Sequence, residues 1–286
     1  MSGGNFVRLL EAVIGRRRMW RVGRRLYQHA RREGPNDPST NGEHDLVRAT
    51  CRLAARQRRG LIALDVGANR GAWTRLLIAE ARAAGLQNCH LYAFEPAPTV
   101  LSDLQAAVLS AGESVKAEVV PCAVSDEPGR APFILSDPLG GTHHLASEAQ
   151  NASGGLLYVD VVTLDSFAKE RCLGFIDIVK VDCEGYDPKV LMGATDLLSA
   201  GRCAVLQFEY NCRWVDTGHY LKEIFALAAR HDLLLGKVVP KGIEFFEDWH
   251  PELERFIETN FVLTKPELAS SLGAHYGTFD EKNTYA

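Results

Sequence analysis

The chain has 286 residues, of which 46% are hydrophobic and 24% charged, and its formal net charge is −4 at pH 7. This composition is ordinary for one large globular domain or two small ones, and it excludes a disordered chain. The charge is uneven: residues 1–33 hold nine arginines against two glutamates, a balance of +7, which leaves −11 for the remainder. An acidic main domain argues against nucleic acid as a partner, because phosphate contacts supply most of that affinity.

The seven cysteines are scattered without a C-x-x-C pair, and several lie in apolar runs, where a reduced thiol behaves as a small hydrophobe. We therefore expect a reducing, cytoplasmic compartment. No stretch approaches the roughly 20 consecutive apolar residues of a membrane-spanning helix, and the arginines in the apolar N-terminal stretch do not fit a secretory signal.

Residues 5–33 repeat apolar side chains at helical spacing among the arginines, with Gly15 and Gly23 as expected break points. This pattern predicts a basic amphipathic helix, for which two interpretations remain open. The helix either makes peripheral contact with an anionic membrane or packs on the main domain with its arginines in solvent. We expect an extension over residues 1–42, including a turn-rich linker, followed by one domain over residues 43–286.

The central motif of the main domain is the run from Leu61 to Gly71. Its apolar start is typical of a buried parallel strand, which stops at Asp65 and turns through Gly67 and Gly71 before a helical pattern begins. The spacing is D-x-G-x-N-x-G, whereas a dinucleotide site needs G-x-G-x-x-G. The run instead resembles the first motif of class I S-adenosylmethionine methyltransferases. That resemblance places the following residues under the methionyl part of the ligand: Asp65, Gly67, Ala68, Asn69 and Gly71.

A second strand, one strand-helix-strand unit further on, ends at Glu95 and Pro96. An acid at this place can accept hydrogen bonds from both ribose hydroxyls, so we expect these residues to bind the cofactor's ribose. A third strand, residues 117–124, ends at Ser125 and Asp126, which we expect beside the adenine.

Residues 132–135 and 158–162 are expected to form a short strand pair added to the same sheet. The polar loop 140–147 between them carries His143 and His144. Adjacent side chains on a loop need not converge, so two interpretations remain open. The histidines are either ordinary loop residues or site residues, with His144 as a candidate catalytic group and His143 as a candidate substrate contact.

The fourth strand is nearly all apolar until Lys180 and then places Asp182 and Glu184 at its carboxyl end. Charges there are costly unless they line a site, and open α/β sheets bind ligands outside the carboxyl ends of their strands. Asp187 and Pro188 then begin a helix, with Asp187 expected as the N-cap and Pro188 at the first helical position.

Several separate stretches resemble the FkbM family of methyltransferases over roughly residues 43–265. They are residues 65–69, 94–96, 163–167, 179–185 and 190–194. Cys183 stands where an aliphatic residue is more usual. The resemblance implies an α/β, Rossmann-like class I fold, with a mostly parallel seven-stranded sheet and helices on both faces. It also implies S-adenosylmethionine as methyl donor, S-adenosylhomocysteine as product, and a hydroxyl of a sugar, glycolipid or polyketide-type natural product as acceptor.

The fifth strand, residues 204–211, again ends in polar side chains, Glu209 and Asn211, which are candidate substrate contacts. The closing strands are expected at residues 233–239, 242–246 and 260–264.

Methyl transfer to a neutral hydroxyl requires in-line positioning and removal of its proton. We expect Asp182 to be the base, Lys180 to orient the acceptor or offset charge, and Glu184 to be its partner, with a histidine as an alternative. A second possibility is that Asp182, Glu209 and Asn211 hold a divalent metal such as Mg²⁺, as in catechol-type O-methyltransferases, which would acidify the hydroxyl.

Two other functional classes are weighed against methyl transfer. A nicotinamide-dependent oxidoreductase is disfavoured by the missing G-x-G-x-x-G. A non-catalytic membrane-surface protein on a degenerate fold would be expected to lack the strand-end charges, which are present.

Overall fold

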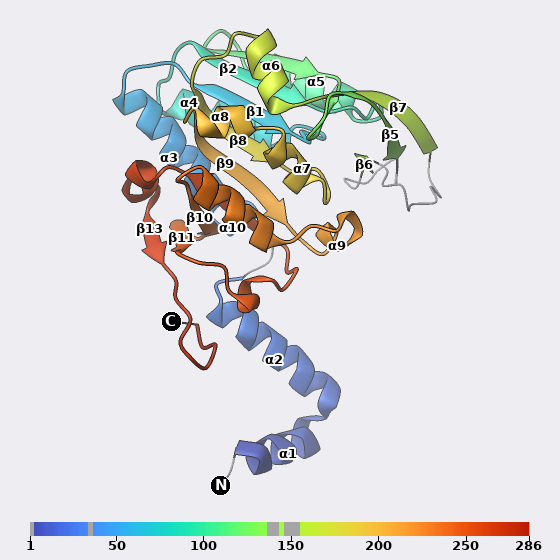
Figure 1. The fold of residues 1–286 in the computed structure, drawn as a ribbon, viewed down its shortest axis with the longest axis vertical. Coiled ribbons are helices and arrows are strands. Elements are labelled where there is room, and N and C mark those ends of the chain that lie inside the picture. The colour runs from blue at the N-terminus through green and yellow to red at the C-terminus, as the bar shows by residue number, and fades with distance from the viewer. Residues whose placement is uncertain (1–2, 34–36, 136–142, 146–154, 286) are drawn as a thin grey trace.

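The computed structural model describes residues 3–33, 37–135, 143–145 and 155–285. The strands of the main sheet are β1 (Ile62–Val66), β2 (Cys89–Phe94), β3 (Val115–Val120), β8 (Ile176–Val181), β9 (Cys203–Tyr210), β10 (Leu234–Val239), β11 (Gly242–Phe246), β12 (Thr259–Thr264) and β13 (Ala274–Tyr276). Within the described residues they form nine strands in the order β13-β11-β10-β12-β9-β8-β1-β2-β3 (Figure 1).

The sheet is mixed, so the expectation of seven mostly parallel strands was wrong in count and in orientation. The half β3-β2-β1-β8-β9 is parallel. On the other side, β12 lies antiparallel between β9 and β10, and β11 returns as a hairpin strand beside β10. The two-residue turn between β10 and β11 forces antiparallel pairing, whereas the helical crossovers of the other half allow parallel pairing.

Helices cover both faces of the sheet, as expected for an α/β fold. They are α3 (Glu43–Arg56), α4 (Ala72–Ala83), α5 (Leu101–Leu109), α6 (Leu164–Glu170), α7 (Asp187–Met192), α8 (Thr195–Ser199), α9 (Trp214–Thr217), α10 (Leu221–Arg230), and the 3-10 helices η1 (Pro251–Leu253) and η2 (Pro266–Leu272). One face packs α6, α7, α8 and α10 through residues such as Phe167 and Ile224. The other packs α3, α4 and η2 through Val47, Leu77 and Leu272. The sheet is therefore buried between two layers.

A second, smaller sheet stands beside the parallel half. Among the described residues it contains β4 (Ala123–Val124), β5 (Gly129–Leu135), β6 (His144–Leu145) and β7 (Gly155–Val162), in the order β4-β7-β5-β6 (Figure 1). The expected third strand over 117–124 is therefore split at Pro121, and its end pairs with β7 instead of continuing in the main sheet. Likewise, β5 and β7 pair with each other but do not extend the main sheet. Of the histidine loop, residues 140–142 and 146–147 lie outside the described residues.

The N-terminal extension forms two helices, α1 (Gly3–Ile14) and α2 (Arg16–Ala30), which project from the main body (Figure 1). The break falls at Gly15, which has φ 77°, whereas Gly23 lies inside α2, so only one of the two expected breaks occurs. No residue of α2 is buried. Across the described part of the chain, no helix has the length and apolar character needed to cross a membrane.

Candidate active site

The turn between β1 and α4 brings the backbone close to the end of β8. Gly67 has φ 78°, and a Cβ at this position would overlap the carbonyl oxygen of Asp182. Asn69 also adopts a left-handed conformation, with φ 48°, and its backbone N–H donates to Glu95 at 2.9 Å. The turn thus joins the carboxyl ends of β1, β2 and β8 at one place.

Glu95 is held by two backbone groups. One carboxylate oxygen accepts from Asn69 N at 2.9 Å and the other from Ala97 N at 2.8 Å. Burial raises the pKa of Glu95, and these two backbone hydrogen bonds oppose the rise. A carboxylate oxygen can accept more than one hydrogen bond, so each retains capacity for a further donor such as a ribose hydroxyl.

Glu95 and Asp182 line the same cavity, which holds about 660 Å³ of empty space, partly open to solvent. The residues that line it include Gly67, Asn69, Glu95, Pro96, His143, His144, Asp182 and Glu184, together with the apolar or weakly polar side chains of Val66, Phe94, Cys122, Ala123, Val124, Phe133, Leu145, Cys183 and Tyr186. An acid flanked by an apolar wall fits a nucleoside, which presents hydroxyls on one side and an apolar ring face on the other.

The end of β8 carries an ion pair. Lys180 is buried, and its Nζ donates to Asp182 at 3.0 Å and lies 3.7 Å from Glu43 of α3. Burial by itself would lower the pKa of Lys180, but the nearby carboxylates of Asp182, Glu43 and Glu209 outweigh it and raise that pKa. Lys180 therefore stays charged, and it contacts Asp182, a residue of the cavity lining whose side chain is 38% exposed.

Glu184 follows in a left-handed conformation, with φ 55°, and its carboxylate is ion-paired with Arg213. The same cavity is lined by His143, whose Nε2 lies 3.5 Å from Thr99 Oγ1, and by His144 in β6. Both histidines predicted from the loop therefore lie at the same cavity as Asp182 and Glu184.

Glu209 and Asn211 are buried beside this cavity and do not line it. Asn211 donates to Glu209 at 2.6 Å, and burial together with Asp182 raises the pKa of Glu209 to about 8. Of the three proposed metal ligands, only Asp182 lines the cavity, so a Mg²⁺ site formed by Asp182, Glu209 and Asn211 stays a prediction. The described residues also contain no cluster of three His, Cys, Asp or Glu side chains able to hold a metal.

Five predicted cofactor residues lie outside the cavity wall. Asp65 is buried and accepts from Thr74 Oγ1 at 2.6 Å, and Gly71 faces Leu104 and Ala107 of α5. Ser125 and Asp126 line a separate cavity together with Lys189 and Thr217. The Glu95 cavity is lined by Cys122 and by β4 in place of Ser125 and Asp126, because the chain turns at Pro121. Ala68 is buried against Ala93 and Leu104.

Asp187 is not the N-cap expected from the sequence. The N-cap of α7 is Tyr186, and Asp187 is the first helical residue, with Pro188 second. Its buried carboxylate accepts from the backbone of Cys183, Gly185 and Glu209 at 3.3 to 3.4 Å. Asp187 therefore ties the turn after β8 to the end of β9.

Sequence reasoning missed Glu43, Phe133 and Tyr186. Glu43 pairs with Lys180, which lies about 140 residues further along the chain. The local sequence shows only an acid in the first turn of a helix, a position that many acids occupy. Phe133 reaches the cavity from the second sheet, whose position the local pattern does not reveal. Tyr186 lies next to the charged strand end, so its proximity to that motif was the available signal.

The family model of the methyltransferase FkbM domain matches residues 65–234. A search of curated proteins finds no match. Among solved structures, an FkbM methyltransferase of Methylobacillus flagellatus is 16% identical, with 71% of this chain and 43% of that chain covered and a TM-score of 0.46. An S-adenosylmethionine-dependent methyltransferase of Agrobacterium tumefaciens is 11% identical, with coverages of 78% and 61% and a TM-score of 0.42.

A TehB-like methyltransferase of Corynebacterium glutamicum is 12% identical, with coverages of 76% and 87% and a TM-score of 0.35. The chain thus spans less than half the length of the Methylobacillus structure. The family match covers more than half of this chain and contains both the glycine turn and the charged end of β8. The chain therefore belongs to the FkbM family of methyltransferases.

Proposed function

We propose that this methyltransferase transfers the methyl group of S-adenosylmethionine to a hydroxyl of a sugar, glycolipid or polyketide-type natural product. The observation that carries the proposal is the shared cavity of Glu95 and Asp182. The buried carboxylate of Glu95 suits a ribose. The partly exposed carboxylate of Asp182 suits a hydroxyl acceptor that enters from solvent.

The residues of the cavity fit this cofactor. Glu95 has acceptor capacity for both ribose hydroxyls, and Phe94 and Phe133 offer an apolar surface for adenine. Gly67 leaves room where a Cβ would collide with the backbone of β8. When bound, the cofactor supplies an electrophilic methyl carbon on a sulfonium.

Asp182 is the proposed base for the acceptor hydroxyl. Lys180 holds its Oδ2 at 3.0 Å, which fixes the carboxylate and leaves its other oxygen to accept the hydroxyl proton. Arg213 neutralises Glu184, so a second free carboxylate does not compete for the same proton. Lys180 also holds the Asp182 carboxylate in place, so that Asp182 can keep the acceptor hydroxyl in line with the methyl group.

The test measures methyl transfer to a panel of hydroxylated glycans and glycolipids by the gain of one methyl mass. We expect Asp182→Asn to lower kcat by about 10²- to 10⁴-fold while the affinity for S-adenosylhomocysteine, measured by titration calorimetry, stays the same. His144→Gln is the matched variant at the same cavity, and it should retain most of the activity. If His144→Gln loses the activity and Asp182→Asn keeps it, the base is the histidine.

A further calorimetric result bears on the whole proposal. Wild-type protein that binds neither S-adenosylmethionine nor S-adenosylhomocysteine would exclude methyl transfer from this cofactor. Activity that is unchanged after EDTA treatment would exclude a metal held by Asp182, Glu209 and Asn211.

A further inference from the structure

The two N-terminal helices, here called the N-terminal arm (residues 3–30), carry an apolar face that the described part of the protein does not cover. In α1, Phe6, Leu9 and Val13 recur at helical spacing and are 60%, 59% and 74% exposed. In α2, Trp20 and Leu26 are 62% and 65% exposed. Large apolar side chains in such number on one surface mark an interaction site.

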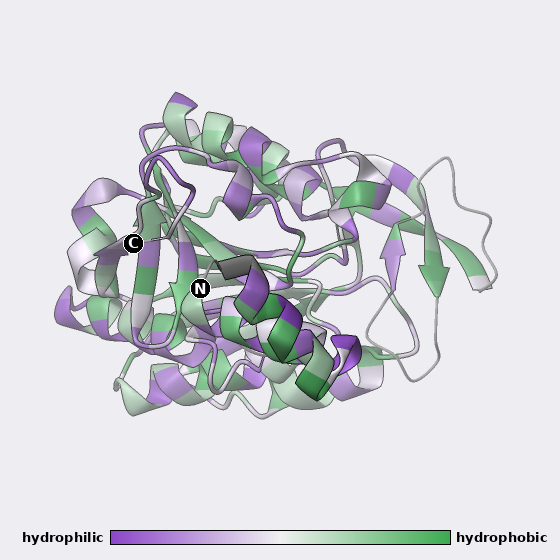
Figure 2. Ribbon diagram, turned by 90° about the horizontal axis from the view of Figure 1, so that it is seen from below, coloured by the Kyte–Doolittle hydropathy of each residue, from purple (hydrophilic) through white to green (hydrophobic). Residues whose placement is uncertain are grey.

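The arginines of α2 lie mainly on the side opposite its apolar residues. At 3.6 residues per turn, Met19, Gly23 and Leu26 share one face, and Arg17, Arg21 and Arg24 gather on the other. Figure 2 views the molecule from the end where the arm projects and shows hydrophobic and hydrophilic residues alternating along it. An apolar face opposite a basic face is typical of helices that lie in the surface of a membrane.

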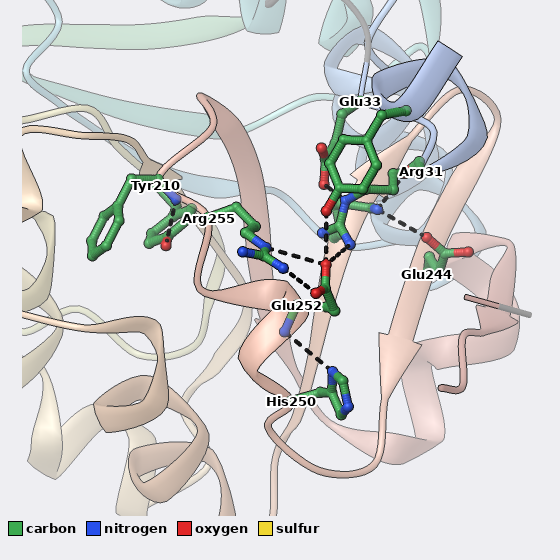
Figure 3. Close-up of polar contacts among 10 residues, drawn as sticks. Arg31, Glu33, Tyr210, Glu244, His250, Glu252 and Arg255 are labelled. Carbon is green, nitrogen blue, oxygen red and sulfur yellow. Dashed lines mark hydrogen bonds and ion pairs between the residues drawn. The ribbon is translucent and has the colours of Figure 1, made fainter. Parts of the chain in front are cut away.

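Within the described residues, the polar contacts that tie the arm to the main body lie at its root, residues 27–33. Tyr27 donates to Glu252 at 2.8 Å, and buried Arg31 donates to Glu33 at 2.8 Å (Figure 3). Lys237, also buried, donates to the carbonyl oxygen of Arg31 at 2.6 Å. These contacts fix the direction in which the arm leaves the main body, while the rest of the arm stays exposed.

We propose that the N-terminal arm docks on an anionic lipid bilayer, with its apolar face in the interface and its arginines against lipid phosphates. Charge complementarity favours this occupant: residues 3–30 contain seven arginines and a single acid, Glu11. A second copy paired through the apolar faces would leave the arginines in solvent without an anionic partner. Nucleic acid would satisfy the arginines and leave the apolar face in water.

The experiment is flotation of the full-length protein with vesicles of phosphatidylcholine that contain about one-third phosphatidylglycerol, compared with pure phosphatidylcholine, at low salt. We expect flotation with the anionic vesicles only. The double variant Phe6→Glu/Trp20→Glu should lower the bound fraction by at least about tenfold, because both side chains would carry charge into the interface.

Matched variants separate the two faces of the arm. Phe6→Leu/Trp20→Phe should float like the wild type. Arg17→Gln/Arg21→Gln should lose flotation, and Arg17→Lys/Arg21→Lys should keep it. All these side chains are exposed, and equal far-UV circular dichroism would show that the fold is retained.

Three results would overturn the proposal: no flotation of the wild type, equal flotation of Phe6→Glu/Trp20→Glu, or equal flotation with neutral vesicles. A stable dimer by light scattering that Trp20→Glu dissociates, without vesicle binding, would assign the arm to a second copy. Flotation requires no turnover, so its outcome is independent of the proposed methyl transfer.

Discussion

Glu95 is the residue on which cofactor recognition is expected to depend most. Its two oxygens already accept backbone N–H groups, and Gln would replace one oxygen with an amide that faces Asn69 N or Ala97 N as donor against donor. Hydrogen bonds to a charged group contribute about 1.5 to 3 kcal/mol. We therefore predict that Glu95→Gln weakens binding of S-adenosylhomocysteine by about 10- to 100-fold, as measured by titration calorimetry.

The control for this variant is Glu113→Gln, which makes the same chemical change at an exposed position. It should bind like the wild type. Unchanged affinity in Glu95→Gln, with the fold intact, would remove Glu95 from the ribose site.

Asp65 makes the stability of the protein depend on pH. Burial, opposed by the hydrogen bond from Thr74, raises the pKa of Asp65 from its ordinary value of 3.8 to about 7. Because the folded pKa lies above the unfolded one, the folded state binds this proton more tightly. Its contribution to stability is complete below about pH 4 and is lost as the pH rises toward 7.

We predict that Asp65→Asn flattens the fall in the free energy of unfolding between pH 5 and 7, by at most about 1.4 kcal/mol per pH unit. Urea unfolding at several pH values measures this slope. The carbonyl of Asn can still accept from Thr74, so the variant should fold. An identical slope in both proteins would show that Asp65 does not titrate in this range.

At the scale of elements, the turn from β1 into α4 depends on the absence of a side chain at Gly67. A Cβ there would be strained by φ 78° and would also collide with the backbone of Asp182. Gly85 at the end of α4 has φ 69° and open space around it. Only the φ penalty, about 1 to 2 kcal/mol, applies at Gly85.

We predict that Gly67→Ala lowers the free energy of unfolding by more than about 3 kcal/mol, whereas Gly85→Ala costs about 1 to 2 kcal/mol. Urea unfolding of the two variants compares a strained and crowded site with a strained and open one. Equal losses would mean that the approach of the turn to β8 is not tight.

At the scale of the whole molecule, a buried ionic cluster joins the root of the N-terminal arm to β10 and β11. Lys237 Nζ lies 3.2 Å from Glu244 Oε2. Arg31 forms an ion pair with Glu33 (Figure 3). Burial lowers the pKa of Lys237 and raises that of Glu33, while their opposite charges limit both shifts. The cluster therefore tolerates burial only as long as its charges remain paired.

We predict that Lys237→Met destabilises the protein by about 3 to 5 kcal/mol, because it leaves Glu33 and Glu244 with too little compensating charge. Lys241→Met, the same change at an exposed position, should cost less than about 0.5 kcal/mol. Thermal or urea unfolding measures both. Similar stability of the two variants would show that the cluster contributes specificity and little energy.

Much of the parallel half of the sheet could be predicted from local pattern. The apolar runs of β1 and β8, the glycine turn and the acid after β2 each show their role within about ten residues, because burial of a parallel strand demands an apolar run and a ligand edge demands polar residues at its end. The FkbM resemblance rests on the same short motifs.

Pairing between distant segments was decided by the tertiary structure. The split at Pro121, the second sheet and the insertion of β12 between β9 and β10 all depend on partners far along the chain. Glu43 is a site residue only because α3 brings it to Lys180. A local sequence pattern shows which side chains favour burial. Which surfaces bury one another, and therefore which charged groups meet, depends on the packing of the whole chain.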